Sequence, residues 1–150
     1  MTDPIRNLSH DHADLNQRVV AIASLLRTQA PDPETHDELV LALGHLREDL
    51  FLHFAREEEA VFPFIATTVP ELAAQIDAMA TAHDTICGAL ARACHLAEND
   101  AAVDAIAPVF ERFQVVYADH ASAESILLRS LDRKLQPAQR DELAALVAGI

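Results

Sequence analysis

The feature that most constrains this chain is a histidine followed four residues later by a glutamate, which occurs twice in segments of helical apolar spacing. The first pair is His53 and Glu57, and the second is His120 and Glu124. Residues four apart lie one above the other on the same face of a helix. Each pair therefore presents an imidazole and a carboxylate side by side, as two ligands for one metal site.

Apolar side chains at three- and four-residue steps predict four long helices. Their stripes run from Ile5 to Leu26, from Leu39 to Val61, from Leu72 to Cys94 and from Val103 to Leu131. With 51% apolar residues and three glycines, the composition also favours helix over sheet. Short connections between long helices favour antiparallel neighbours. We therefore predict an all-α, up-down-up-down four-helix bundle.

Prolines mark the expected helix boundaries. Aspartate followed by proline at Asp3-Pro4 and again at Asp32-Pro33 is typical of a helix start, Pro70 opens the third helix, and Ala30-Pro31 and Asn99-Asp100 are turns. Pro63 predicts a kink or an end of the second helix, with a tail to about Val69, and Pro108 predicts a kink or a late start of the fourth. After Gln136-Pro137, apolar spacing predicts a short C-terminal helix that carries Leu143, Leu146, Val147 and Ile150. We expect it to cap the bundle rather than to seal a dimer.

Length and charge limit the classes of protein. The 150 residues suit one domain, residues 1–150. A net charge of -13 argues against binding to nucleic acid and to anionic membranes. The sequence has neither a membrane-spanning run nor a signal peptide. Cys87 and Cys94 are too far apart along one predicted helix to form a disulfide. We therefore expect a soluble, cytoplasmic protein.

A lone histidine precedes each histidine–glutamate pair, one predicted helix upstream. These are His12 and His83, and each is expected about 24 to 26 Å from the connection that leads to its pair. The paired histidines start about 30 Å beyond the same connections. Spacing therefore predicts that all six side chains fall in one layer. His10 and His12 cannot both face inward, and only His12 has apolar neighbours one turn on either side.

Taken singly, each of these residues has a simpler interpretation. A histidine on an apolar face is usually a core residue, and a histidine–glutamate pair is often a surface contact. Four imidazoles and two carboxylates in one buried layer are prohibitive without a cation, however. The only base beside them, Arg56, lies on the flank of its helix and can reach outward. We therefore predict a dinuclear metal centre, and we interpret His36, His45 and His95 as surface or more distant supporting groups.

The segment His53-Phe-x-x-Glu-Glu-x-x-x-Phe-Pro63 and the second histidine–glutamate pair resemble the hemerythrin-like, or HHE cation-binding, domain. The resemblance spans the chain from His12 to Glu124. It implies a non-haem di-iron centre, with the four histidines as terminal ligands and the two glutamates bridging. The implied ligands are His12, His53, Glu57, His83, His120 and Glu124.

Two further residues bear on this resemblance. Oxygen-carrying hemerythrins have another histidine one turn after the histidine of the third helix, where this chain has Cys87. That departure puts reversible oxygen carriage in doubt. Cys87 is either a labile ligand or site thiol or, as we favour, a small core residue. Tyr117, one turn before His120, can hydrogen-bond or ligate iron, although a packed tyrosine with a satisfied hydroxyl is commoner.

We expect a stand-alone di-iron protein that binds and reacts with O2, H2O2 or NO, in sensing, detoxification or iron handling. A passive O2 or iron binding module and a di-iron oxygenase with an organic substrate are the alternatives, so whether the protein is an enzyme stays open. Manganese or zinc can replace iron at such ligands. We expect a monomer or a weak homodimer.

Overall fold

The computed structural model describes residues 3–27 and 33–149, and this part of the chain is all-α. The predicted turn at Ala30-Pro31, the cap at Asp32 and the apolar contact of Ile150 lie outside the described residues. The elements are α1 (Pro4–Arg27), α2 (Pro33–Arg56), a π-helical turn η1 (Glu57–Val61), α3 (Phe62–Thr68), a 3-10 turn η2 (Pro70–Leu72), α4 (Ala73–Glu98), α5 (Val103–Lys134) and α6 (Pro137–Ala148). The prediction of an all-α fold is confirmed.

The helix starts follow the proline signals. At the start of α1, Asp3 Oδ1 accepts a hydrogen bond of 3.0 Å from the backbone N–H of Ile5, and Pro4 is the first helical residue. At the start of α6, the side chains of Gln136 and Gln139 form a reciprocal capping box before and within the first turn. Residues whose side chains satisfy free backbone groups thus fix the starts of the first and the last helix.

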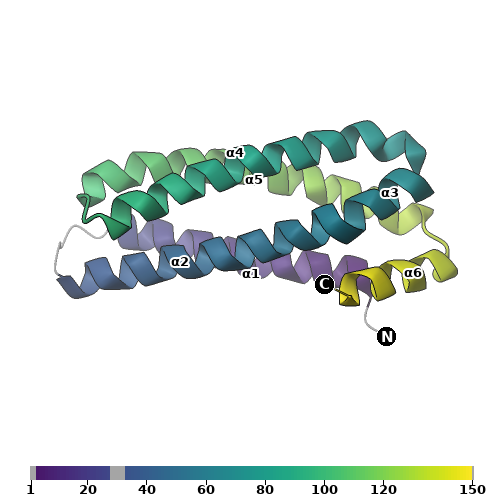
Figure 1. The fold of residues 1–150 in the computed structure, drawn as a ribbon, viewed down its shortest axis with the longest axis horizontal. Coiled ribbons are helices and arrows are strands. Elements are labelled where there is room, and N and C mark those ends of the chain that lie inside the picture. Colours follow the sequence, from purple (N-terminus) through teal and green to yellow (C-terminus); the bar gives the residue numbers. More distant parts are fainter. Residues whose placement is uncertain (1–2, 28–32, 150) are drawn as a thin grey trace.

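The long helices lie side by side, and consecutive ones run in opposite directions in Figure 1. Helix α1 packs on α2 and α5, and α4 packs on the same two neighbours, α2 and α5. Helix α6 packs on η1 and α1, at the end of the molecule where the chain begins. Its Leu143 is buried, whereas Leu146 is exposed. The C-terminal helix therefore covers its own core, as predicted, although with a narrower apolar face.

The second helix does not end at Pro63 but is interrupted just before it. Residues Glu57–Val61 form a π-helical turn, in which the N–H of Phe62 donates to the carbonyl of Glu57, five residues back. Pro63 has no N–H and cannot continue the ordinary four-residue pattern, so the proline favours an irregular turn at this place. The helix then resumes as α3, with Pro63 in its first turn.

Two other boundaries differ from the prediction. The fourth helix starts at Val103, so the late start at Pro108 was wrong, and the proline lies inside α5. Pro108 is the sixth residue of α5, so its missing N–H removes one helical hydrogen bond, the one to the carbonyl of Asp104. The third helix begins with the 3-10 turn η2, so regular helix starts at Ala73 rather than at Pro70.

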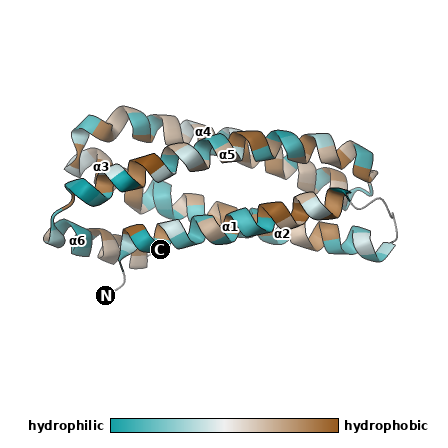
Figure 2. Ribbon diagram, turned by 180° about the vertical axis from the view of Figure 1, so that it is seen from behind, coloured by the Kyte–Doolittle hydropathy of each residue, from teal (hydrophilic) through white to brown (hydrophobic). Residues whose placement is uncertain are grey.

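Two apolar clusters fill the interior. One contains Leu15 to Ile22 of α1, Leu39 to Phe54 of α2, Ile86 to Ala97 of α4 and Ile106 to Tyr117 of α5. The other contains Ile5 and Leu8 of α1, the η1–α3 region, Ile76 and Met79 of α4, and residues from Leu127 to Leu143. Hydrophobic and hydrophilic residues alternate along every long helix in Figure 2, as expected for helices with one buried face. None of the described helices combines the length and the apolar character that a membrane crossing needs.

Candidate metal centre

A layer of buried polar side chains separates the two apolar clusters. It takes one or two residues from each long helix: His12 from α1, His53 from α2, Glu57 from η1, His83 from α4, and His120 and Glu124 from α5. Tyrosine aside, these six are the buried polar or charged side chains among the described residues, and none is more than 8% exposed. The structure thus brings together the six residues that the spacing singled out.

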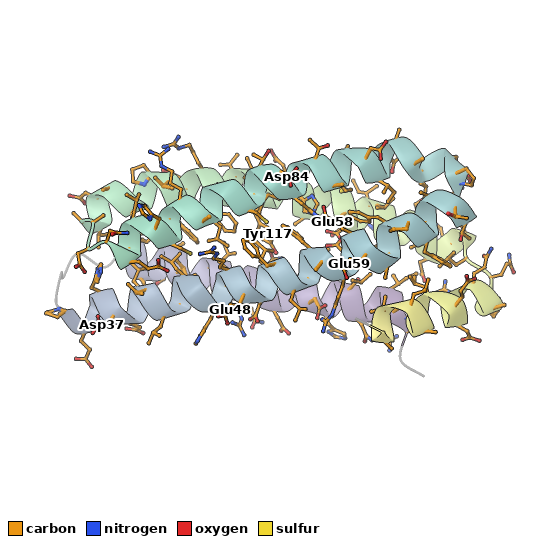
Figure 3. All side chains as sticks on the ribbon, viewed as in Figure 1. Asp37, Glu48, Glu58, Glu59, Asp84 and Tyr117 are labelled. Atoms are coloured by element: carbon orange, nitrogen blue, oxygen red, sulfur yellow. The ribbon has the colours of Figure 1, made fainter. Side chains whose placement is uncertain are left out.

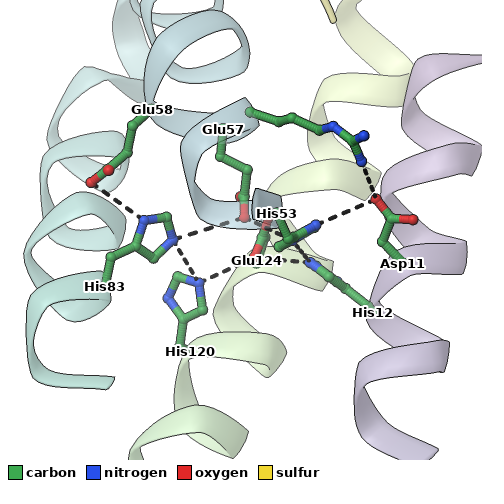
Figure 4. A network of polar contacts seen from close by, with 9 residues as sticks. Asp11, His12, His53, Glu57, Glu58, His83, His120 and Glu124 are labelled. Carbon is green, nitrogen blue, oxygen red and sulfur yellow. Dashed lines mark hydrogen bonds and ion pairs between the residues drawn. The ribbon is translucent and has the colours of Figure 1, made fainter. Parts of the chain in front are cut away.

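The four imidazoles meet in two pairs, and each pair is joined through its Nε2 atoms (Figure 4). His12 Nε2 lies 3.0 Å from His53 Nε2, and His83 Nε2 lies 3.2 Å from His120 Nε2. We call these the first and the second histidine pair. Two ring nitrogens this close, aimed at each other from different helices, are placed as neighbouring ligands of one ion would be.

The carboxylates of Glu57 and Glu124 lie between the two histidine pairs, and each carboxylate contacts one histidine of each pair. Glu124 Oε2 is 3.1 Å from His12 Nε2 and 3.2 Å from His120 Nε2. On the other side, Glu57 Oε1 is 2.8 Å from His53 Nε2 and 3.8 Å from His83 Nε2. A carboxylate that reaches two ligand groups at once is suited to bridge two ions.

Donor atoms of these residues fall into two overlapping groups, each compact enough to hold a metal ion. One group is His12, His53, Glu57 and Glu124, and the other is Glu57, His83 and His120, with the ligand atoms of each within 4.8 Å of one another. Both oxygens of Glu57 and Oε2 of Glu124 are buried without a regular hydrogen-bond partner. Buried carboxylate oxygens without donors are costly, and a cation removes that cost. The donor set therefore fits a metal.

Without a cation, the two carboxyl groups share a proton. Burial, followed by the neighbouring Glu124, raises the pKa of Glu57 well above its usual range. Burial also opposes ionisation of Glu124, but its close contacts with Glu57, His12 and His120 hold its pKa well below the usual value. Glu57 is thus the protonated partner and Glu124 the charged one. A cation held by Glu57 and Glu124 would take the place of that proton, so that metal binding would release it.

His83 is held neutral, which is the state that a metal ligand needs. Burial, together with the nearby His120, lowers its pKa to about 3. The ring is stacked on Phe54, with centroids 3.6 Å apart, and lies 5.4 Å from the ring of Phe62. These aromatic walls keep water away from the second histidine pair.

Two carboxylates beside the layer were missed by the spacing argument. Asp11 Oδ2 lies 3.5 Å from His53 Nδ1, and Glu58 Oε1 lies 3.5 Å from His83 Nδ1. Helical spacing places Glu58 off the inward face of its own helix, and Glu58 is exposed in the structure, but its carboxylate reaches His83 on α4. The available signal was adjacency, because Asp11 precedes His12 and Glu58 follows Glu57.

Tyr117 lies inside the bundle (Figure 3) and is 4% exposed. Its hydroxyl is buried without a hydrogen-bond partner among the described residues, so the expected satisfied hydroxyl was wrong. Burial, and then the negative charge of Glu124, raise the pKa of this phenol. Tyr117 therefore keeps its phenolic proton in the interior, and its O–H donates to none of the described residues.

Cys87 is half-buried and packs against the first apolar cluster, and it belongs to neither group of donor atoms. This agrees with a core residue rather than a ligand. Burial, and then the acidic neighbours Glu58 and Asp84, raise the pKa of its thiol to about 11. A thiol in that state is a poor metal ligand, since metals bind the thiolate.

The remaining histidines lie away from the layer. His10 is exposed while His12 is buried, which agrees with the choice of His12 as the inward residue. His45 and His95 are exposed. His36 is half-buried at the far end of the bundle, where its Nε2 lies 3.0 Å from the carbonyl oxygen of Ala97, so it has no supporting role at the layer.

The surface hollows near the layer are small or shallow. A hollow of about 140 Å³ between α1 and α2 is lined by His53, Asp11, Arg56 and the ion-paired Arg18 and Asp49. A groove of about 610 Å³ between α1 and α6 is larger, but its lining includes none of the six layer residues. The hollow between α1 and α2 thus reaches the layer at His53.

Comparison with known proteins agrees with this geometry. Neither curated proteins nor solved structures give a match to the chain. The family model for the hemerythrin HHE cation-binding domain matches residues 3–131, which include the whole layer and the helices that carry it. The protein therefore belongs to the hemerythrin HHE cation-binding domain family.

Proposed function

We propose that the layer binds two iron ions as a non-haem di-iron centre, one ion at each histidine pair. The observation that carries this proposal is that Glu57 and Glu124 each contact one Nε2 atom of both pairs. Membership of a cation-binding family supports it independently. The four long helices would then form the up-down-up-down bundle that the resemblance implies.

The ligand set favours two borderline first-row ions over one ion. Structural zinc takes four ligands in a tetrahedron, whereas the layer offers four imidazoles and two carboxylates. Mixed imidazole and carboxylate ligands suit iron and manganese, and they also accept zinc. Iron is our assignment, and manganese or zinc at the same residues is the alternative.

We further propose that the centre binds and reacts with small oxidants, O2, H2O2 or NO. Two iron ions supply electrons and open coordination positions for such ligands. The apolar clusters on both sides of the layer exclude bulk water, and the small hollow above His53 suits only small molecules. Tyr117 holds a buried phenolic O–H that is free to donate to a ligand in the interior. Cytoplasmic location and a monomer or weak homodimer stay predictions from the sequence.

Reaction is favoured over passive oxygen carriage by the residue one turn after His83. This residue is Cys87, which stays a thiol at neutral pH and contributes no donor to the layer. The ion at the second pair would then have fewer protein ligands than in an oxygen carrier with a histidine there. Fewer ligands leave more room for redox chemistry with the bound oxidant.

The test is elemental analysis of the purified protein, with absorption spectra before and after anaerobic reduction and on return to air. We expect two irons per chain and near-ultraviolet bands that vanish on reduction and return in air. A folded protein that holds no metal, or only traces of zinc, would overturn the di-iron centre. If iron is present, O2 release from peroxide or loss of NO indicates turnover, whereas a stable oxygenated spectrum indicates a carrier.

A further inference from the structure

The outer nitrogens of the histidine layer point to a second set of functional residues. Each imidazole has two ring nitrogens, and in all four histidines Nε2 faces the centre of the layer. The other nitrogen, Nδ1, is then left to meet the protein around it. In metal sites that nitrogen usually donates to a carboxylate or carbonyl, which fixes the ring orientation and raises its basicity as a ligand.

One histidine of each pair has a carboxylate within ion-pair distance of this nitrogen, although neither nitrogen makes a regular hydrogen bond. In the first pair it is His53, whose Nδ1 lies 3.5 Å from Asp11 Oδ2, and in the second it is His83, whose Nδ1 lies 3.5 Å from Glu58 Oε1 (Figure 4). No such contact occurs at the Nδ1 atoms of His12 and His120 within residues 3–27 and 33–149. The support is therefore divided evenly between the two pairs, one carboxylate to each.

Both contacts cross between helices. Asp11 belongs to α1 but reaches a histidine of α2, and Glu58 belongs to η1 but reaches a histidine of α4. Each carboxylate is also the sequence neighbour of a layer residue, His12 or Glu57. Each therefore fixes the ring on the neighbouring helix relative to a ligand on its own helix.

The surroundings of the two carboxylates differ. Asp11 Oδ2 lies 3.9 Å from Nη1 of Arg56, at the edge of the hollow between α1 and α2. Glu58 is near Asp84 and Glu59, and no cation contacts it among the described residues. One carboxylate is thus partly neutralised by a guanidinium, while the other keeps its full charge beside other acids. Two ions held by similar ligands would experience different electrostatic fields.

We propose that Asp11 and Glu58 are positioning residues, Asp11 for the ion held by the first histidine pair and Glu58 for the ion held by the second. They act through His53 and His83, by holding the proton on Nδ1 so that Nε2 is free to bind metal. The two metal positions are therefore inequivalent. This inference rests on the proposed dinuclear centre.

The experiment compares Asp11→Asn and Glu58→Gln, which keep side-chain size and remove the charge. The matched controls are Asp14→Asn and Glu59→Gln. Asp14 is an exposed residue one turn after Asp11 on α1, and Glu59 is the exposed neighbour of Glu58. Co(II), which is stable in air and has a useful spectrum, is titrated into each metal-free protein. We expect about 10- to 100-fold weaker binding of one Co(II) equivalent in each variant, and no change in the controls.

A second readout separates positioning from a general structural role. Long-range proton–nitrogen NMR spectra of the metal-free protein report which nitrogen of each imidazole carries the proton. Asp11→Asn should move the signals of His53 and leave His83 unchanged, whereas Glu58→Gln should do the reverse. Asp11→Glu and Glu58→Asp, which restore the charge, should recover part of the lost affinity.

The possible outcomes distinguish this inference from the proposed function. If the unaltered protein takes up two Co(II) and both variants match their controls in affinity and in NMR signals, the positioning role is wrong and the dinuclear centre stands. If the folded, unaltered protein takes up no Co(II), the proposed centre fails and this inference fails with it. If both variants weaken the same equivalent, the assignment of one carboxylate to each ion is overturned.

Discussion

The two histidine pairs are built alike but lie in different surroundings. The first pair, His12 and His53, adjoins a polar hollow with Asp11 and Arg56 in its wall. The second pair, His83 and His120, packs against aromatic rings instead. Phe54 stacks on His83 and meets His120 edge-on at 5.5 Å. The chain thus repeats one ligand pattern and varies the local dielectric and charge around it.

This difference suggests a division of tasks. Charged side chains and the hollow give the first pair a route for exchange with solvent, since the hollow reaches His53 itself. The apolar wall of the second pair excludes water, and in a low dielectric electrostatic interactions are stronger. An exogenous ligand between the pairs would therefore meet one solvated side and one dry side.

The largest expected effect comes from Glu124→Ala, which removes an oxygen that lies about equally close to both histidine pairs. We expect the variant to lose both ions together, since Glu124 Oε2 is about as close to His12 as to His120. A ligand at 1,000 times its dissociation constant stabilises a fold by about 4 kcal/mol, and the variant should lose that gain. The measurement is chemical unfolding with and without anaerobic Fe(II).

The control for this change is Glu111→Ala, an exposed residue on the same helix. It should keep both ions and the stabilisation by Fe(II). A Glu124→Ala protein that still binds one ion would show that the pairs work independently. That result would weaken the view that the shared carboxylates couple the two surroundings.

The second largest expected effect concerns the protonation of His83 in the apolar surroundings of the second histidine pair. Because its pKa in the folded protein is lowered to about 3 by burial, the unfolded chain binds the extra proton first. The stability contributed by the neutral ring is complete above the unfolded pKa, about 6.5, and is lost as the pH falls toward 3. The metal-free protein should therefore lose up to about 1.4 kcal/mol of unfolding free energy per pH unit below 6.5 through this one group.

His83→Gln should flatten this part of the pH dependence, as measured by urea unfolding between pH 5 and 6.5 in the presence of a chelator. Glu57 works in the opposite direction, because its raised pKa makes the folded state hold a proton that the unfolded state releases. The contribution of His83 is therefore the difference between the pH profiles of the His83→Gln and unaltered proteins. The exposed His95, changed to Gln, serves as the control and should leave the slope unaltered. Parallel profiles for His83→Gln and the unaltered protein would mean that His83 is not held neutral by its surroundings.

The sequence predicted the layer because its signals are local. Helical period decides which residue of a run faces inward, so His12 could be chosen over His10, and Glu57 over Glu58. Equal spacing from the connections then predicted one common level. The apolar clusters above and below follow from the same stripes.

Contacts between helices could not be predicted in this way. Asp11 and Glu58 contact histidines on neighbouring helices, and these contacts depend on how far apart and at what angle the helices pack.

The burial of Tyr117 could not be predicted either, because both Val116 and Tyr117 lie one helical step from Phe113. The structure buries Tyr117 and leaves Val116 half-buried. The π turn was also not predicted, because the apolar spacing was followed with a regular helical period, whereas one extra residue in a turn rotates the following side chains by about 100°.

The smallest expected effect tests the acidic surroundings of the second pair through Cys87. Burial raises the pKa of this thiol to about 11, from 9.0, and the charges of Glu58 and Asp84 add to the shift. Its thiolate fraction at pH 8 is then about 100-fold below that of an ordinary thiol, and alkylation should be slower in proportion. Glu58→Gln removes one of the charges, so alkylation of Cys87 should speed up by less than tenfold, as followed by mass spectrometry with iodoacetamide.

The control is Glu48→Gln, which changes an exposed residue of α2 and should leave the alkylation rate unaltered. Equal rates in the Glu58→Gln and unaltered proteins would mean that the charge of Glu58 does not act on the thiol of Cys87.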